Sequence, residues 1–362
     1  MKQLAFVFGL AIALAIGPLA AIFGSVARAQ GAAHDETGAL TAGPVEIAKT
    51  PLEKRFAGTY AEFSTFVGSG TFYSGGYHDP YVSNALYLKP VYHLGTKRDL
   101  TLNARFYVEV EYTQPDNPQA RRFYPLDPWF WLSAKNLYTE PRTRIRFSGQ
   151  VRAVLPLSYE SRYQHLLTGL GVGGSATRES EFGRPAANGK RWNLSLSLGV
   201  VASKNFNTSV LRGNGPGDTN GCMSAPAATT ETSAAEPGVA NSDRCGGPLN
   251  TSFSLMTAGG VTLTRSRWSA AATLILINNF RYTAPVDAFS STDTPLGRED
   301  VTWGILSLGY EIHPRLGVAV GLSSQQPALD QRYRYPRFPF FDFSGTNANN
   351  YSQVFANVNG TI

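Results

Sequence analysis

The chain carries little charge, almost no cysteine and only one long apolar run. Lys, Arg, Asp and Glu make up 16 % of its 362 residues, whereas aromatic residues make up 12 %. A disordered chain has the opposite balance, so this composition excludes one. The mean hydropathy of −0.16 excludes a bundle of membrane helices, because each such helix needs an apolar run of about 20 residues.

The one long apolar run lies at the N-terminus and predicts a signal peptide over residues 1–29. Lys2 precedes the run, and Ala27-Arg28-Ala29 forms a small-x-small cleavage site, so we expect the mature chain to begin at Gln30. The alternative is a single membrane anchor. Removal of Lys2 and Arg28 takes the net charge from +6 to +4, which is too weakly positive to indicate a nucleic-acid partner.

The rest of the chain is patterned with a period of two residues. Between residues 100 and 112 the even positions are apolar or aromatic, and the odd positions read Thr, Asn, Arg, Tyr, Glu and Glu. Residues 144–155, 192–203 and 316–323 also alternate. This period indicates β-strands whose faces meet different surroundings. The runs are long, because strands of soluble sheets cluster near about 5–6 residues.

Long alternating strands predict a transmembrane β-barrel. About 9–11 tilted residues cross a bilayer, and hydrocarbon tolerates no unpaired backbone group, so the strands must close on themselves. One face then meets lipid and the other meets the lumen. We expect twelve antiparallel strands, at residues 56–67, 84–94, 99–113, 128–138, 143–155, 164–178, 191–205, 251–264, 267–282, 300–313, 315–325 and 351–362. The connections after even-numbered strands are short, and most of those after odd-numbered strands are long. Outer-membrane barrels show the same difference in length between their periplasmic turns and their external loops.

Three segments follow from this assignment. Residues 1–29 are the expected signal peptide, residues 30–55 a flexible periplasmic strip, and residues 56–362 the barrel. A soluble all-β sandwich or propeller is the alternative. A sandwich needs polar outer faces, whereas Phe106, Trp192 and Trp303 lie in strand segments near their ends, which favours the aromatic girdles of a membrane barrel. No repeat of about 40–50 residues supports a propeller.

The last strand carries the most specific signal. Apolar and small residues alternate to the end of the chain, at Val354, Ala356, Val358, Gly360 and Ile362. This resembles the C-terminal signal of Gram-negative outer-membrane β-barrel proteins, although that family usually ends in Phe or Trp. The stretch from Leu155 to Leu170 is similar to a strand–loop–strand unit of porin-like barrels. The resemblance implies the outer membrane of a Gram-negative bacterium, with outer-membrane lipid and the barrel-assembly machinery as partners.

Ionisable residues opposite the apolar faces are candidates for the lumen. They are Lys89, His93, Arg105, Glu109, Glu111, Lys135, Arg144, Arg146, Arg152, Lys204 and Glu311. Four of them, Arg105, Arg144, Arg146 and Arg152, lie on the third and fifth strands, and we expect a basic ladder that faces Glu109 and Glu111. The ladder either fills the barrel with mutual salt bridges or lines an anion-selective path. A twelve-stranded barrel is narrow or plugged compared with a wide porin.

Three functions remain open. The first is a narrow channel or passive transporter for small polar or anionic solutes. The second is a non-conducting structural or surface barrel whose external loops bind a partner, and the third is a lipid-acting barrel enzyme. None of the five histidines lies in a serine–histidine–asparagine pattern, so we expect no enzyme, and no motif indicates a cofactor or metal.

Loops and glycines complete the sequence-based predictions. Cys222 and Cys245 lie in a Gly/Ala/Ser-rich loop over residues 206–250 and are expected to form a disulfide after export. The aromatic and basic run over residues 333–343 predicts either a lid over the barrel mouth or a contact with sugar or lipid headgroups. Glycines between Gly171 and Gly174 lie inside a strand, where they relieve crowding.

Overall fold

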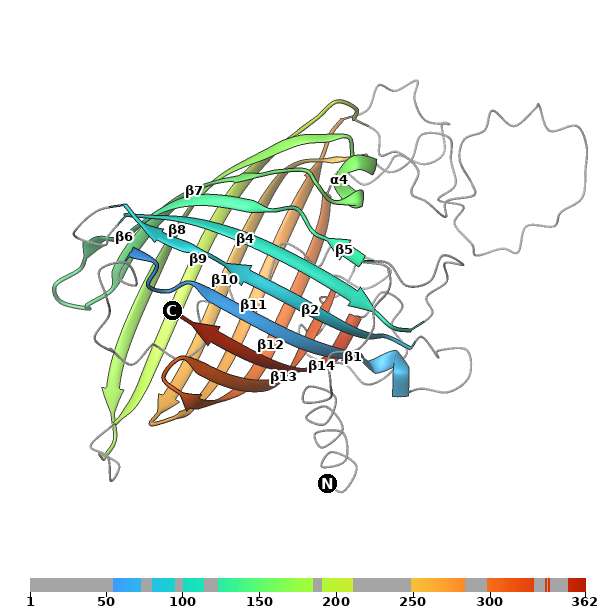
Figure 1. The fold of residues 1–362 in the computed structure, drawn as a ribbon. Helices are drawn as coiled ribbons and strands as arrows, with labels where there is room; N and C mark the ends of the chain where they lie inside the picture. The colour runs from blue at the N-terminus through green and yellow to red at the C-terminus, as the bar shows by residue number, and fades with distance from the viewer. Residues whose placement is uncertain are drawn as a thin grey trace, which may run out of the picture.

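The first and last strands pair with each other and close the sheet into a barrel (Figure 1). In this computed structural model Tyr60 pairs with Thr361, and Gly68 pairs with Gln353. The structure describes residues 55–72, 80–94, 100–113, 123–184, 191–210, 249–283, 298–328, 336, 338 and 351–362. Among these residues, no helix combines the length and apolar composition that a membrane crossing requires.

Over the residues that the structure describes, the barrel consists of antiparallel strands and two short helical segments. The strands are β1 (Tyr60–Gly68), β2 (Val82–Lys89), β3 (Val91–His93), β4 (Leu100–Glu111), β5 (Phe123–Pro125), β6 (Trp129–Thr139), β7 (Arg146–Val154), β8 (Leu166–Phe182), β9 (Trp192–Asn207), β10 (Thr251–Arg265), β11 (Trp268–Arg281), β12 (Arg298–His313), β13 (Leu316–Pro327) and β14 (Tyr351–Thr361). The helical segments are η2 (Ser69–Phe72) and α4 (Tyr159–Tyr163).

Fourteen segments make twelve barrel strands, because two barrel strands are interrupted. β2 and β3 pair with successive parts of β4 and are separated by Pro90, which has no N–H to donate. β5 and β6 also pair with β4, and residues 126–128 separate them. The twelve strands predicted from the sequence are therefore confirmed, each within a few residues of its predicted bounds.

The two ends of the barrel differ. At one end, the turn end, short connections join β6 to β7, β10 to β11, and β12 to β13, and both termini of the ring lie there. The other end, the loop end, carries α4, β5 and η2 (Figure 1). The strand ends that lead into the long connections lie at the loop end, and the start of β1 and the end of β14 lie at the turn end, as expected of external loops and periplasmic turns.

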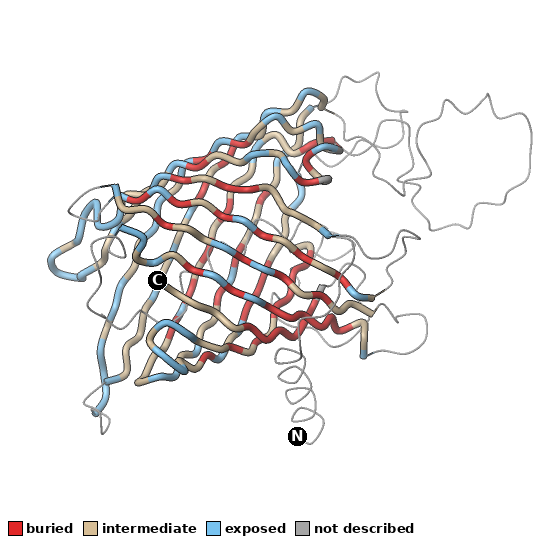
Figure 2. The backbone as a smooth tube through the Cα atoms, in the orientation of Figure 1, coloured by how far each residue is buried: buried red, intermediate tan, exposed pale blue. Residues whose placement is uncertain are grey.

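Alternation along β4 separates the lumen from the outer surface. Thr101, Asn103 and Arg105 are buried, whereas Leu100, Leu102 and Phe106 are each at least 39 % exposed. Figure 2 shows the same alternation of buried and exposed positions on the neighbouring strands. The predicted inward and outward faces of β4 are thus confirmed, and the apolar face points outward.

The interior of the barrel is filled by side chains over part of its length. Inward residues from β1, β2, β4, β9–β12 and β14 form one apolar cluster, which includes Ile275, Met256 and Phe355. Trp303 also belongs to this cluster and is only 4 % exposed. Its placement in an outer girdle was wrong, because Trp303 has the same parity as the inward residue Ile305.

Several expectations fall on residues that the structure does not describe. They are the signal peptide over residues 1–29, the strip over residues 30–54, the Cys222–Cys245 bridge and most of the aromatic run over residues 333–343. They stay predictions.

Candidate lumenal site

Two arginines and a lysine meet two tryptophans on the inner wall of β2, β4, β6 and β7. Arg105 and Trp129 are a direct cross-strand pair, as are Trp131 and Arg152. The guanidinium carbons of Arg105 and Arg152 each lie 4.4 Å from the centroid of the Trp129 ring. The Lys89 ammonium lies 5.4 Å from the Trp131 ring. We call these five residues the cation–tryptophan cluster.

The two arginines and two tryptophans of the cation–tryptophan cluster are almost fully buried, whereas Lys89 is partly exposed. Arg105 is 1 % exposed, Arg152 is 9 % exposed, and both tryptophans are 8 % exposed. A charge removed from water is costly unless other groups stabilise it. The negative face of an indole ring supplies such stabilisation, and desolvation strengthens it. The cluster therefore holds positive charge inside the barrel on aromatic rings.

Arg152 reaches across a neighbouring strand to anchor its guanidinium group. Its Nε and one terminal nitrogen donate to Ser203 Oγ on β9 at 3.3 and 2.8 Å, although β8 lies between the two strands. The reach crosses Gly171, where a Cβ atom would lie 2.8 Å from Arg152 Nε and 2.7 Å from Ser203 Oγ. Gly171 therefore makes room for the Arg152 side chain, in agreement with the prediction that glycines relieve crowding in this strand.

Buried acids on the same inner wall are held by hydroxyl groups. Glu109 accepts hydrogen bonds from Tyr81 and, at 3.3 Å, from Tyr107 Oη. Thr113 Oγ1 donates to Glu111 at 3.1 Å. On β1, Ser64 Oγ donates to Glu62 at 2.6 Å. Acidic and basic groups thus line one side of the lumen, opposite a wall on which apolar residues of β9–β12 lie.

The structure does not bring the four arginines of the expected basic ladder together. Arg144 lies in the exposed turn before β7, with a left-handed φ of 58°, so its assignment to the lumen was wrong. Arg146 has the inward parity, but it lies at the turn end and forms an ion pair with Glu179. Only Arg105 and Arg152 of the four arginines belong to the buried cluster.

Three other candidates lie away from the cluster. Lys135 is exposed, within the register shift between Ala134 and Tyr138. Glu311 has inward parity near the turn end, where its backbone N–H donates to Arg267 O at 2.8 Å. Lys204 was expected to face inward, which was wrong: it pairs with the outward residues Leu170 and Phe253.

Two histidines make local contacts. His93 Nε2 lies 2.9 Å from Ala57 O, and His313 Nδ1 accepts a hydrogen bond from the Arg315 backbone N–H at 3.3 Å. The lumenal roles of Trp129, Trp131 and Ser203 were not predicted. Residues 129–132 are all apolar, so hydropathy does not show which of them face inward. The cross-strand pairing of Trp129 with Arg105 is the signal that identifies them.

Comparisons with known structures find an outer-membrane channel, the transport unit of an autotransporter and an outer-membrane protein. An outer-membrane channel from Pseudomonas putida F1 is 11 % identical, with a TM-score of 0.45, over 89 % of this chain and 100 % of that one. The transport unit of the autotransporter AIDA-I from Escherichia coli is 10 % identical, with a TM-score of 0.39, over 93 % and 100 %. Omp33 from Acinetobacter baumannii is 8 % identical, with a TM-score of 0.26, over 85 % and 98 %.

No protein-family model matches the chain, and no curated protein matches it in sequence. Barrels of one architecture perform unrelated tasks, so function depends on the residues of this lumen. The location follows from the chain's own architecture. The closed ring, its outward apolar face and the contrast between turn end and loop end are those of a Gram-negative outer-membrane β-barrel.

Proposed function

We propose that the barrel is a narrow channel for small anionic solutes, in which the cation–tryptophan cluster sets ion selectivity. The observation that carries this proposal is the pair of lumenal guanidinium groups, each 4.4 Å from the Trp129 ring. Rings of charged side chains set the selectivity of pores, and positive ones favour anions. Both guanidinium groups are buried inside the barrel, so an ion that passes this level meets them at close range.

The burial of the cluster bears on how the channel conducts. Arg105 and Trp129 are 1 % and 8 % exposed, so side chains fill this level of the lumen. Passage therefore requires these side chains to move, and we expect small, interrupted currents rather than the steady current of a wide porin. The same filled interior supports a second function, a non-conducting barrel that acts through its external loops.

Planar-bilayer recordings under a salt gradient test the channel proposal. The wild-type barrel is expected to give a reversal potential of the sign that anion selectivity requires. Arg105→Gln and Arg152→Gln, made singly, should each shift that potential toward cation selectivity. Arg144→Gln is the matched control, because it removes one positive charge from an exposed turn.

The outcomes separate the two functions. Absence of current from a folded wild-type barrel, checked by its heat-dependent gel mobility, overturns the channel proposal and favours the non-conducting barrel. A current whose reversal potential is the same in Arg152→Gln as in Arg144→Gln removes the cluster from ion selection while leaving a channel in place.

A further inference from the structure

One row of residues crosses the outer wall near the loop end. Lys204 on β9 pairs with Phe253 on β10, Phe253 pairs with Phe280 on β11, and Phe280 pairs with Arg298 on β12. Paired residues of antiparallel strands project on the same face, and Phe253 and Phe280 are each 36 % exposed. The row therefore presents two aromatic rings between two cations on the outer surface, and we call it the upper row.

Each cation of the upper row contacts an aromatic ring. The rings of Phe253 and Phe280 have centroids 5.8 Å apart, and the Arg298 guanidinium carbon lies 5.5 Å from the Phe280 ring. Lys204 Nζ lies 4.9 Å from the Tyr282 ring and donates to Ser252 Oγ at 2.5 Å. The cations are thus placed by their neighbours, and the Arg298 side chain stays 54 % exposed.

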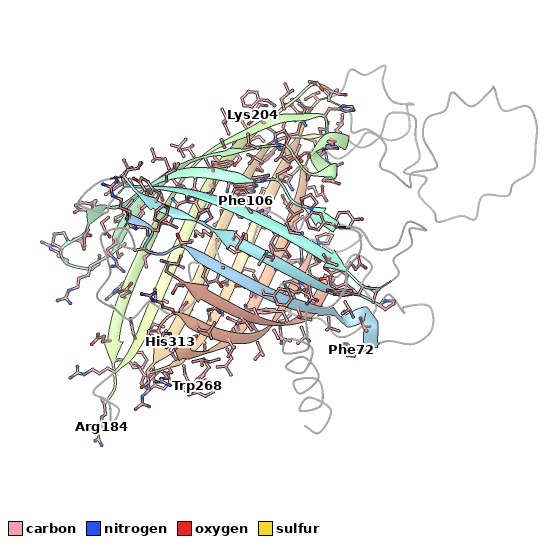
Figure 3. The ribbon with its side chains drawn as sticks, in the orientation of Figure 1. Phe72, Phe106, Arg184, Lys204, Trp268 and His313 are labelled. Carbon is pink, nitrogen blue, oxygen red and sulfur yellow. The ribbon has the colours of Figure 1, made fainter. Side chains whose placement is uncertain are left out.

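A second row marks the other boundary of the same wall. At the turn end the Trp268 and Tyr310 rings lie 4.8 Å apart, and the Arg265 guanidinium lies 5.0 Å from the Trp192 ring. Figure 3 shows Trp268 near the turn end and Lys204 toward the other end of these strands. Lys204 and Trp192 are twelve positions apart on β9 (204 − 192 = 12), as are Phe280 and Trp268 on β11 (280 − 268 = 12).

This spacing matches the thickness of a bilayer. Twelve steps of about 3.3 Å along a strand tilted by roughly 45° span about 28 Å along the membrane normal, close to the hydrocarbon thickness of about 30 Å. The outward residues of β9 between the rows are Leu194, Leu196, Leu198, Val200 and Ala202. The upper row therefore lies where the outer leaflet changes from acyl chains to headgroups.

The positive charges of the upper row indicate which lipid headgroup it would bind. A cation on the lipid-facing wall is tolerated near the interface, where it meets anionic groups. Arg298 Nε pairs with Asp300 at 2.7 Å, and Asn278 donates to the same carboxylate at 2.8 Å. Within the described ranges no carboxylate pairs with Lys204. Lys204 and Arg298 stand three strand spacings apart, about 14 Å, which suits two separate anionic groups.

We propose that the upper row binds a phosphorylated glycolipid of the outer leaflet. Lys204 and Arg298 contact its phosphates, and the Phe253 and Phe280 rings pack against the sugar and the first methylene groups of its acyl chains. This site faces away from the lumen, so it does not depend on the channel proposal.

Native mass spectrometry of the detergent-purified full chain tests this site with lipid A that carries two phosphates as the probe. The wild-type barrel should retain this lipid more strongly than monophosphoryl lipid A or phosphatidylglycerol. Lys204→Gln should weaken retention by about tenfold, the loss of one charge-assisted contact, and Lys204→Gln with Arg298→Gln should weaken it further. Inorganic phosphate at equal concentration should not displace the lipid.

Arg265→Gln is the matched control, because it removes a cation beside an aromatic ring at the opposite boundary. It should leave retention of lipid A unchanged. Equal retention by the wild-type barrel and the Lys204→Gln, Arg298→Gln double variant overturns the proposal. Equal retention of phosphatidylglycerol by the wild-type barrel also overturns it, and that arm requires no variant to fold. Displacement by inorganic phosphate would show an anion site without a lipid requirement and would overturn it too.

Discussion

Arg105 and Arg152 come from strands on either side of β6, and both guanidinium groups lie over the same ring, that of Trp129. The two arginines are far apart in sequence. They meet because β6 lies between β4 and β7 and carries the Trp129 indole ring that both contact. Their mutual repulsion is offset because each cation has a π face as its neighbour. The Trp129 ring should therefore contribute to the stability of the barrel by stabilising two buried positive charges.

Replacement of Trp129 tests this link through stability. Trp129→Ala should destabilise the barrel by about 3–5 kcal/mol, because it removes a buried ring and leaves two buried cations without it. Trp129→Phe keeps a ring with a weaker attraction for cations and should cost less. Urea unfolding in lipid vesicles, followed by circular dichroism, measures both. A double-mutant cycle of Trp129→Phe with Arg152→Met should show a coupling of about 0.5–2 kcal/mol; strictly additive effects would contradict the arrangement.

Gly171 offers a second test, because any side chain there competes with the Arg152 guanidinium group. Gly171→Ala should destabilise the barrel by about 1–3 kcal/mol through overpacking. Gly259→Ala on β10 is the matched control, since its Cβ would meet no atom within 4 Å. It should change stability by less than about 0.5 kcal/mol. The same unfolding measurement compares the two, and equal midpoints would show that Arg152 does not need the space above Gly171.

The sequence predicted the barrel far better than it predicted the lumen. Where one face of a strand is polar, as along β4, the period of two reports both the strand and its inward side. Residues 129–132 are apolar on both faces, so the same rule finds the strand but not the direction of Trp129. The predicted outward position of Trp303 was wrong for a related reason, because an apolar wall of the lumen resembles a lipid-facing wall in hydropathy.

Turn geometry and cross-strand neighbours explain the remaining differences. Arg144 continues the alternation of β7 in sequence, but its φ of 58° places it in the turn before the first ladder pair of that strand. The contact between Arg152 and Ser203 joins strands that are not neighbours in the sheet, and it depends on a glycine between them. Neither feature follows from periodicity, because both depend on the three-dimensional register.

The segment that carries α4 at the loop end is expected to depend on Asp127. Its Oδ1 accepts from the Ser158 backbone N–H at 2.7 Å, and its other carboxylate oxygen accepts from the Ser161 hydroxyl. Both serines are buried, so Asp127→Ala should cost about 1–3 kcal/mol locally by leaving their donors unsatisfied. Trypsin cleavage after the exposed Arg162, measured on proteoliposomes, should become faster. Asp127→Asn keeps an acceptor oxygen and should lie between the two, whereas equal cleavage of Asp127→Ala and the wild type would contradict this role.

The turn between β6 and β7 should respond to pH through Glu140. The Thr143 hydroxyl donates to its carboxylate at 2.6 Å, and the backbone N–H groups of Thr143 and Arg142 add to this, which lowers the pKa of Glu140. A folded-state pKa below the unfolded value of about 4.3 stabilises the turn above that pH, and the stabilisation is lost as the pH falls through the folded-state pKa. Hydrogen exchange of the Thr143 amide should therefore show protection, corrected for intrinsic rates, that falls as the pH drops below about 4. Glu140→Gln should remove this pH dependence, and a variant that retained it would assign the effect to another group.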